Sequence, residues 1–216
     1  MSGEAAAEPG RREQNKLDKA ERIRAAASSL FKTHGYGQAT LRQIARRAHV
    51  GLGTLFTYAE DKRDLIFLIF NEELGQLTDE ALALSVDGDV VTRLLSIYRH
   101  HYEYFGARPE LSRILLQELT FYSSGKQSEA FLQTRRRLMK GIEDIVRQAQ
   151  RDGKITGTED ASFIARNLFF VYSAAIRWWI SNPRPKVAAG LEELRRVIEL
   201  QMTGLTPAAP KRKRRD

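Results

Sequence analysis

Apolar residues recur at every third or fourth position along most of the chain, which is the spacing that buries one face of an α-helix. The first such segment covers 18–34, and Gly35 follows it as a left-handed C-cap. Two short segments come next, over 41–48 and 51–58, and a longer one covers 60–84. No segment shows the strict alternation of a β-strand, so the pattern predicts an all-α protein.

The rest of the chain continues the helical pattern after a break at SVDGD, residues 85–89. Helices are expected over 90–106, over 109–122, in a long basic segment that ends near 152, over 160–180, and over 187–202. The sequence ends in PAAPKRKRRD, which is too charged and proline-rich to pack in a core.

Basic residues are in excess only at the two ends of the chain. Residues 1–70 hold 12 Lys or Arg against 8 Asp or Glu, residues 71–204 hold 18 of each, and residues 205–216 hold 5 against 1. The net charge of +8 is therefore +4 at each end of a neutral middle. A basic module beside a neutral body is typical of a phosphate-binding domain with a separate partner domain, although a solvated cationic surface gives the same numbers.

Composition excludes several classes of protein. No apolar run approaches the ~20 residues of a membrane span, and the first residues lack the apolar core of a signal peptide, so a cytoplasmic protein is expected. The 216 residues include no cysteine, and adjacent histidines such as His100 and His101 point in different directions on a helix, so we expect no metal and no cofactor. Phosphate-loop, Rossmann and Gly-x-Ser-x-Gly motifs are absent, which argues against an enzyme.

Gly51 and Gly53 lie in a run, over about 40–59, that contains three arginines and no acidic residue. Each glycine costs a helix about 1 kcal/mol relative to alanine. Two short helices joined by a tight turn are typical of a helix-turn-helix, whose second helix enters the major groove by its N-terminal end. Missing side chains at that end let the backbone approach DNA, while Leu55 and Phe56 are expected to anchor the short helix to the core.

Residues 17–77 resemble the DNA-binding domain of the TetR family of transcriptional repressors. The matching positions are Ala27, Leu30, Phe31, Gly35, Thr40, Ile44, Ala45, Ala48, Val50, Thr54, Leu55, Phe56, Tyr58, Lys62 and Leu65. Two positions depart from the family pattern. His49 replaces the usual glycine of the turn, which is tolerable because histidine visits positive φ more readily than bulkier residues, and Ala59-Glu60 replaces the usual Phe-Pro.

The resemblance implies an N-terminal three-helix helix-turn-helix domain, joined by a linking helix to a C-terminal helical domain for ligand binding and dimerisation over 78–206. Residues 1–16 and 207–216 are then a disordered arm and a disordered basic tail. The linking helix is expected to be the only element able to pass a change between the two domains.

The implied function is that of a sequence-specific transcriptional regulator, a repressor that a small, mainly apolar or aromatic effector releases from a palindromic operator. The alternative is a ligand-independent architectural DNA-binding protein, for which the KRKRR tail is the main evidence. A footprint that protects a palindrome indicates the first function, and uniform coating of DNA indicates the second.

Carried over residue by residue, the family's DNA contacts fall on eight residues. Arg42 can reach a base edge, with guanine as its best partner. Lys62 lies in the first turn of a helix, where a cation opposes the helix dipole, which suggests a partner outside the protein. The groove-facing candidates are Arg42, Leu52, Gly53 and Thr57, and the phosphate-binding candidates are Thr40, Thr54, Tyr58 and Lys62.

Two further sets of candidates lie in the C-terminal region. Polar-tipped aromatic and apolar residues share helix faces and form either a ligand pocket or ordinary core: Tyr98, His101, Tyr102, Phe105, Leu115, Leu119 and Tyr122. The segment 160–180 is apolar almost all round, more than one helix of a monomer can bury, which predicts a homodimer with a four-helix bundle across a twofold axis. The interface candidates are Phe163, Phe170, Trp178, Leu191, Leu194 and Ile198.

Overall fold

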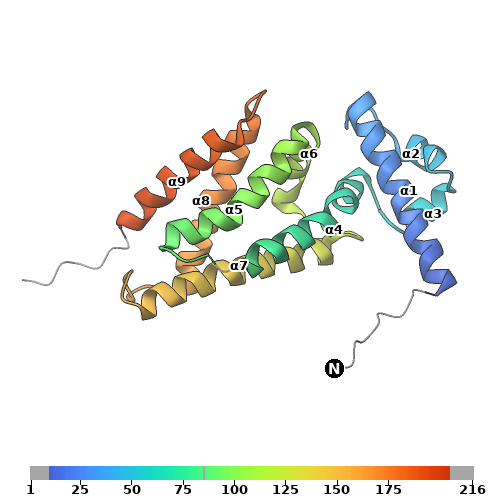
Figure 1. Cartoon of the computed structure of the whole chain (residues 1–216). Helices are drawn as coiled ribbons and strands as arrows, with labels where there is room; N and C mark the ends of the chain where they lie inside the picture. Colours follow the sequence, from blue (N-terminus) through green and yellow to red (C-terminus); the bar gives the residue numbers. More distant parts are fainter. Residues whose placement is uncertain (1–9, 85, 205–216) are drawn as a thin grey trace, which may run out of the picture. The chain divides into compact units, whose positions relative to one another are not determined.

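The computed structural model describes residues 10–84 and 86–204, and all regular structure within them is helical, as predicted (Figure 1). No helix in this part of the chain is both long and apolar enough to cross a bilayer. The elements are α1 (Arg11–His34), α2 (Leu41–Arg47), α3 (Leu52–Phe56), α4 (Lys62–Ala83), α5 (Val90–Ala107), α6 (Pro109–Glu118), the 3₁₀ helix η1 (Leu119–Phe121), α7 (Ser128–Arg151), α8 (Ala161–Ser181) and α9 (Val187–Thr203).

The first helix begins earlier than its apolar pattern suggests. Residues 11–16 were expected in a disordered arm, but α1 starts at Arg11. These turns bury nothing and are built from good helix formers such as Arg, Glu, Gln and Lys. A hydrogen bond from Gln14 to Asp18, 3.0 Å long, supports the same turns. The rest of the predicted arm, residues 1–9, and the predicted tail lie outside the described residues.

The chain forms two compact units, and their boundary is discontinuous in sequence. Unit 1 comprises the residues up to Glu72 together with Gln117–Phe131, and unit 2 comprises Glu73–Leu116 and the residues from Leu132 onward. The chain therefore passes between the units three times, within α4, within α6 and within α7. The expectation that the linking helix is the only connection is wrong, because a segment distant in sequence belongs to the helix-turn-helix unit.

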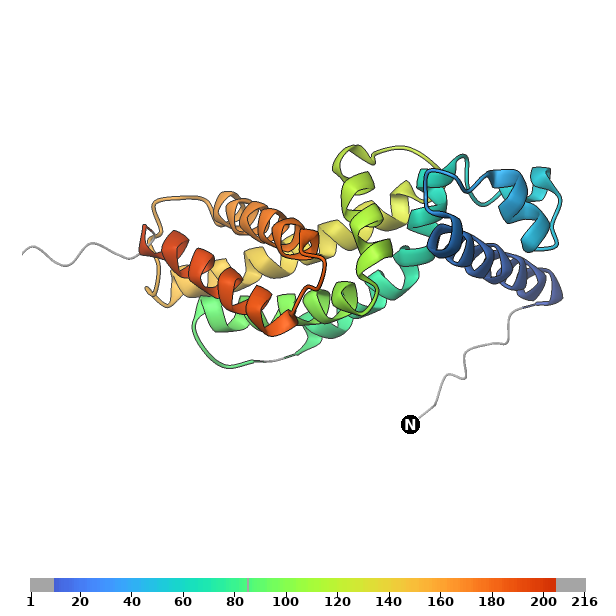
Figure 2. The same ribbon diagram turned by 90° about the horizontal axis from the view of Figure 1, so that it is seen from above.

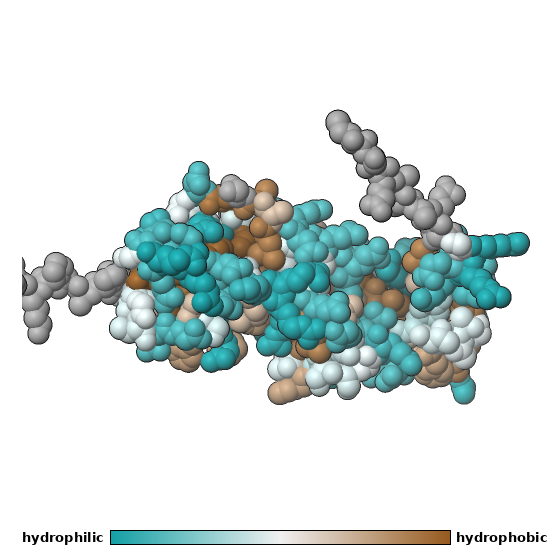
Figure 3. Space-filling view, turned by 90° about the horizontal axis from the view of Figure 1, so that it is seen from below, coloured by the Kyte–Doolittle hydropathy of each residue, from teal (hydrophilic) through white to brown (hydrophobic). Residues whose placement is uncertain are grey.

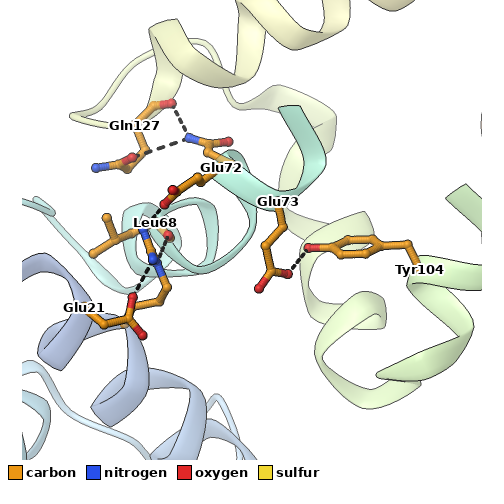
Figure 4. A network of polar contacts seen from close by, with 8 residues as sticks. Glu21, Leu68, Glu72, Glu73, Tyr104 and Gln127 are labelled. Carbon is orange, nitrogen blue, oxygen red and sulfur yellow. Dashed lines mark hydrogen bonds and ion pairs between the residues drawn. The ribbon is translucent and has the colours of Figure 1, made fainter. Parts of the chain in front are cut away.

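In unit 1, α4 is covered on more than one side, since every residue from Asp64 to Phe70 is buried. Arg24 of α1 donates to the Leu68 carbonyl over 3.1 Å and pairs with Glu72 over 2.8 Å (Figure 4). The segment 117–131 supplies other contacts, because the Tyr122 ring stacks on Phe67 with centroids 3.6 Å apart. Cover from two directions explains an apolar run that is not amphipathic.

In unit 2, α5 packs against α8 and α9, which lie side by side (Figure 2). The close approach of α9 depends on Gly190, because a Cβ there would lie 2.5 Å from Trp179 Cδ1 and 2.7 Å from Tyr102 Cε1. The Trp179 ring is held in place by a 2.9 Å hydrogen bond to the Lys186 carbonyl. The buried side chains of this core include Leu94, Tyr98, Tyr102, Tyr172, Ile176, Trp179, Leu191, Leu194 and Ile198.

Candidate functional site

The helix-turn-helix begins with a reciprocal cap on α2. Thr40 Oγ1 accepts from the Gln43 backbone N–H over 3.2 Å, and Gln43 Oε1 accepts from the Thr40 N–H over 2.9 Å, which satisfies two otherwise unpaired donors. The turn after α2 is made by His49 at φ 53°, the positive φ that its place in the turn predicted. Val50 then donates to the Ala45 carbonyl over 3.0 Å and closes the turn.

The short helix α3 is anchored by fewer residues than expected. Leu55 is fully buried, but Phe56 is 43% exposed, so its predicted role as an anchor is wrong. Ala59, fully buried just beyond the helix, covers the core instead. A Cβ on Gly53 would meet no atom within 4 Å, so no packing contact inside the protein requires glycine at this position.

All eight predicted DNA-contacting residues lie in unit 1, on α2, on α3 or within a few residues of α3. Thr40, Arg42, Gly53 and Thr57 are exposed, and the other four are half-buried. Within the described part of the chain, the Arg42 guanidinium makes no hydrogen bond or ion pair. Arg42 is therefore available to a partner, which suits a base reader.

Three of the predicted phosphate contacts already have partners in the protein. The Tyr58 hydroxyl donates to the Lys16 carbonyl over 3.1 Å, and Thr57 Oγ1 donates to the Thr54 carbonyl over 2.7 Å. The ammonium of Lys62 donates to two carbonyls of the α1–α2 connection, at 2.8 Å each, and lies 5.1 Å from the centre of the Tyr36 ring. The reasoning that Lys62 must find its partner outside the protein is thus wrong, because this ammonium ties α4 to the end of α1.

Unit 1 also contains a polar centre that sequence reasoning missed. Asp64, buried in α4, accepts from the Tyr122 hydroxyl and from the backbone N–H groups of Glu60 and Lys126, the latter two at 2.8 and 2.9 Å. The carboxylate and this burial raise the pKa of Tyr122. An acidic residue in the first turn of a helix is common, so nothing in the sequence marks Asp64 as the group that holds the segment 117–131.

The predicted ligand residues are divided between the units. Leu119 and Tyr122 belong to unit 1, so they are not part of one cluster with the residues of α5. The others are buried in unit 2, where Tyr98 stacks on Tyr172 with ring centroids 4.1 Å apart. Burial raises the pKa of Tyr98 and lowers that of His101 to about 4. The buried residues of the predicted set in unit 2 are Tyr98, His101, Tyr102, Phe105 and Leu115.

Three buried polar atoms in this cluster have no hydrogen-bond partner: Tyr98 Oη, Tyr102 Oη and His101 Nδ1. The other ring nitrogen of His101, Nε2, lies 3.3 Å from Thr78 Oγ1, whose own proton goes to the Leu74 carbonyl over 2.7 Å. His101 Nε2 must then be the donor to Thr78, which leaves Nδ1 as a bare acceptor. The cluster therefore has two unused hydroxyl donors and one unused acceptor.

An open cavity of about 890 Å³ lies elsewhere in unit 2. Its apolar lining includes Leu82 of α4, Ile97 of α5 and Ile145 of α7, and its charged lining comprises Arg93, Arg136, Arg137, Lys140 and Lys154 against Asp87 and Asp144. Figure 3 shows hydrophobic surface hollowed between hydrophilic side chains on one face of the protein, in keeping with this composition. The only sequence signal was the i, i+4 spacing of Arg136 and Lys140 on a basic helix, which is equally typical of a solvated face.

The predicted dimer residues also separate into two groups. Phe163, Phe170 and Trp178 of α8 are 46%, 53% and 70% exposed. Their spacing of seven and eight residues places them along one side of the helix. The α9 residues Leu191, Leu194 and Ile198 are buried in the core of the protomer, so the structure does not leave them free for a second chain.

Comparison with known proteins agrees with this architecture. The family described as "Bacterial regulatory proteins, tetR family" matches residues 23–69, and "Tetracyclin repressor-like, C-terminal domain" matches residues 87–184. The "Fatty acid metabolism regulator protein" of Bacillus subtilis is 22% identical over 186 residues, which cover 83% of this chain and 92% of that protein.

Two solved structures share the fold. Thermus thermophilus FadR, a TetR family repressor in complex with lauroyl-CoA, has a TM-score of 0.65 at 24% identity, over 88% of this chain and 97% of that one. Bacillus subtilis FadR in complex with stearoyl-CoA has a TM-score of 0.65 at 20% identity, over 86% of this chain and 98% of that one.

Proposed function

We infer, from the premise that this chain belongs to the TetR family of bacterial regulatory proteins, that it is a dimeric repressor released from its operator by a fatty acyl thioester of coenzyme A. The observation that carries the DNA-binding half is the exposed helix-turn-helix of unit 1. It combines an unpaired Arg42 with a glycine, Gly53, that no internal contact requires.

The operator is proposed to be a palindrome. One helix of five residues, α3, offers few side chains to base edges, so a second recognition helix is needed for specificity. Two recognition helices related by a twofold axis meet successive major grooves when they lie about 34–36 Å apart. The exposed row Phe163, Phe170 and Trp178 on α8 supports a dimer that supplies the second helix.

The effector proposal rests on the cavity of unit 2 and on the two similar structures. A long acyl chain requires an apolar wall, and the phosphates of coenzyme A require cations. The cavity has both, and five cations outnumber the two acids in its lining. Two proteins of the same fold hold acyl-CoA ligands, which supports this class over a neutral aromatic effector.

Selection of bound fragments from random DNA, followed by affinity measurements on the selected site, tests the DNA-binding half. Arg42→Ala is expected to weaken binding by about 1–3 kcal/mol and to relax base preference at one position of each half-site. Arg47 is a matched control, because it is also exposed on α2 but lies about 140° around the helix from Arg42. Equal base preference in Arg42→Ala and wild type, or uniform coating of DNA by the wild type, would overturn the proposal.

A further inference from the structure

The cavity of unit 2 and the unpaired polar atoms of α5 are connected by helix geometry. Arg93, Ile97 and His101 follow one another at intervals of four residues, so they lie on one face of α5, about 6 Å apart along its axis. Arg93 and Ile97 line the cavity, and His101 is the next residue inward on that face.

The neighbouring helix shows the same progression. Leu82 lines the cavity on α4, and Thr78 lies one turn earlier on the same face. Thr78 contacts His101 over 3.3 Å, so the α4–α5 contact runs directly from the apolar wall of the cavity to the unpaired atoms.

The unpaired atoms are complementary to an amide group. An amide oxygen accepts two hydrogen bonds, and an amide N–H donates one. Tyr98 and Tyr102 provide two hydroxyl donors, and His101 Nδ1 provides one acceptor, all at least nine-tenths buried. Buried polar groups of this kind are normally satisfied, so three of them together indicate a missing polar partner.

The mouth of the cavity suits a phosphate. Lys140 is paired with Asp144 over 2.8 Å and Arg137 with Asp79 over 2.7 Å. Arg93, in contrast, makes no ion pair with any described residue. Its guanidinium is therefore the cation in the lining best placed to gain from a phosphate, which it can bind in a bidentate manner.

We propose that this cavity recognises the coenzyme A part of the effector, with Arg93 on a phosphate and with Tyr98, Tyr102 and His101 on an amide of the pantetheine arm. The proposal rests on the proposed function and adds the basis of selectivity. A free fatty acid carries neither phosphate nor amide, so the site distinguishes the thioester from the free acid.

Calorimetric titration of the full-length protein with lauroyl-CoA, laurate and coenzyme A tests the proposal. Lauroyl-CoA is expected to bind the wild type, and laurate is expected to bind at least tenfold more weakly. Arg93→Ala should weaken lauroyl-CoA binding by about 10- to 100-fold, as for a charge-assisted contact. Arg99→Ala, an exposed arginine of α5 outside the cavity, should bind as the wild type.

Tyr98→Phe and Tyr102→Phe separate recognition from folding. Each hydroxyl is unpaired in the protein alone, so its removal should leave the melting temperature of the free protein unchanged or raise it. The same variants should bind lauroyl-CoA about 2- to 10-fold more weakly. A purely structural role would lower the melting temperature instead.

The outcomes distinguish the site from the function. If lauroyl-CoA binds and releases operator DNA but Arg93→Ala and Tyr98→Phe bind it as the wild type does, the assigned site is wrong and the proposed function stands. Equal affinity for laurate and lauroyl-CoA overturns the selectivity. If the wild type binds no lauroyl-CoA, the proposed effector is wrong and the site falls with it.

Discussion

Gly53 shows how a single residue can be assigned to a partner rather than to the fold. It lies inside α3, where glycine is unfavourable, and nothing within the protein occupies the space of its missing side chain. Gly190, in contrast, is required by the rings of Trp179 and Tyr102. The same residue type thus serves recognition in one unit and packing in the other.

We expect Gly53→Ala to leave the free energy of unfolding unchanged or to raise it by up to about 1 kcal/mol, because alanine favours the helix. Operator affinity should fall, since the new methyl group separates backbone and DNA. Gly190→Ala is the contrasting variant and should lose about 1–2 kcal/mol of stability through overpacking. Chemical denaturation and DNA titration of both proteins measure the effects, and unaltered operator affinity in Gly53→Ala would contradict the close approach.

His101 makes stability depend on pH in a defined window. Burial lowers its pKa to about 4, whereas the unfolded chain titrates near 6.5. Above pH 6.5 both states are neutral, and between pH 6.5 and 4 only the unfolded state binds the proton, so stability falls as pH falls. The loss attributable to His101 is expected to reach about 2 kcal/mol at pH 5.

Denaturation of wild type and His101→Gln between pH 7.5 and 4.5 isolates this effect. The stability difference between the two proteins should be constant above pH 7 and should shift in favour of the variant below pH 6.5. His34→Gln, at an exposed histidine, should run parallel to the wild type throughout. A pH-independent difference for His101→Gln would show that His101 is not buried as a neutral group.

At the scale of elements, helix periodicity predicted where the helices lie, because each segment has an amphipathic stripe or a clear break at its ends. It could not predict how the helices are shared between the units. The apolar run from Leu65 to Phe70 was visible, but its second cover comes from residues 117–131, and no local pattern encodes that pairing. For the same reason Tyr122 was assigned to the wrong cluster.

The DNA-facing residues were predictable because they share one short motif, whereas the cavity was not, because α4, α5 and α7 each contribute one or two residues to it. Burial decided the interface candidates. Leu194 and Phe170 look alike in sequence, but only the structure shows that the first is enclosed and the second exposed.

The hold of Asp64 on the segment 117–131 gives a prediction for this scale. Tyr122→Phe removes a hydroxyl donor from a buried carboxylate and is expected to cost about 1–3 kcal/mol in stability. Tyr98→Phe is the matched control, since it removes a buried hydroxyl that has no partner and should cost nothing. Thermal denaturation of the two variants decides; equal melting temperatures would show that the Asp64 contact does not stabilise unit 1.

At the scale of the whole molecule, the exposed aromatic row on α8 is expected to form the dimer interface. Phe170→Glu places a charge in the middle of that row and should give a monomer that has lost most of its operator affinity. Phe121→Glu is the control, because Phe121 is 85% exposed but lies in η1 of unit 1. Sedimentation of both variants tests the assignment, and a dimeric Phe170→Glu protein would place the interface elsewhere.

Induction requires that a change in unit 2 reach unit 1, and α4, α6 and α7 each run through both units. A ligand shifts the protein toward the state it binds better, and only by its preference for that state. The coupling must then be reciprocal, so operator DNA weakens the ligand by the factor by which the ligand weakens the operator.

Titration of lauroyl-CoA into the full-length protein, with and without saturating operator DNA, measures this coupling directly. The account predicts a lower affinity for lauroyl-CoA in the presence of operator, by the same factor as the loss of operator affinity in saturating lauroyl-CoA. Equal lauroyl-CoA affinity in the two titrations would contradict an acyl-CoA-released repressor.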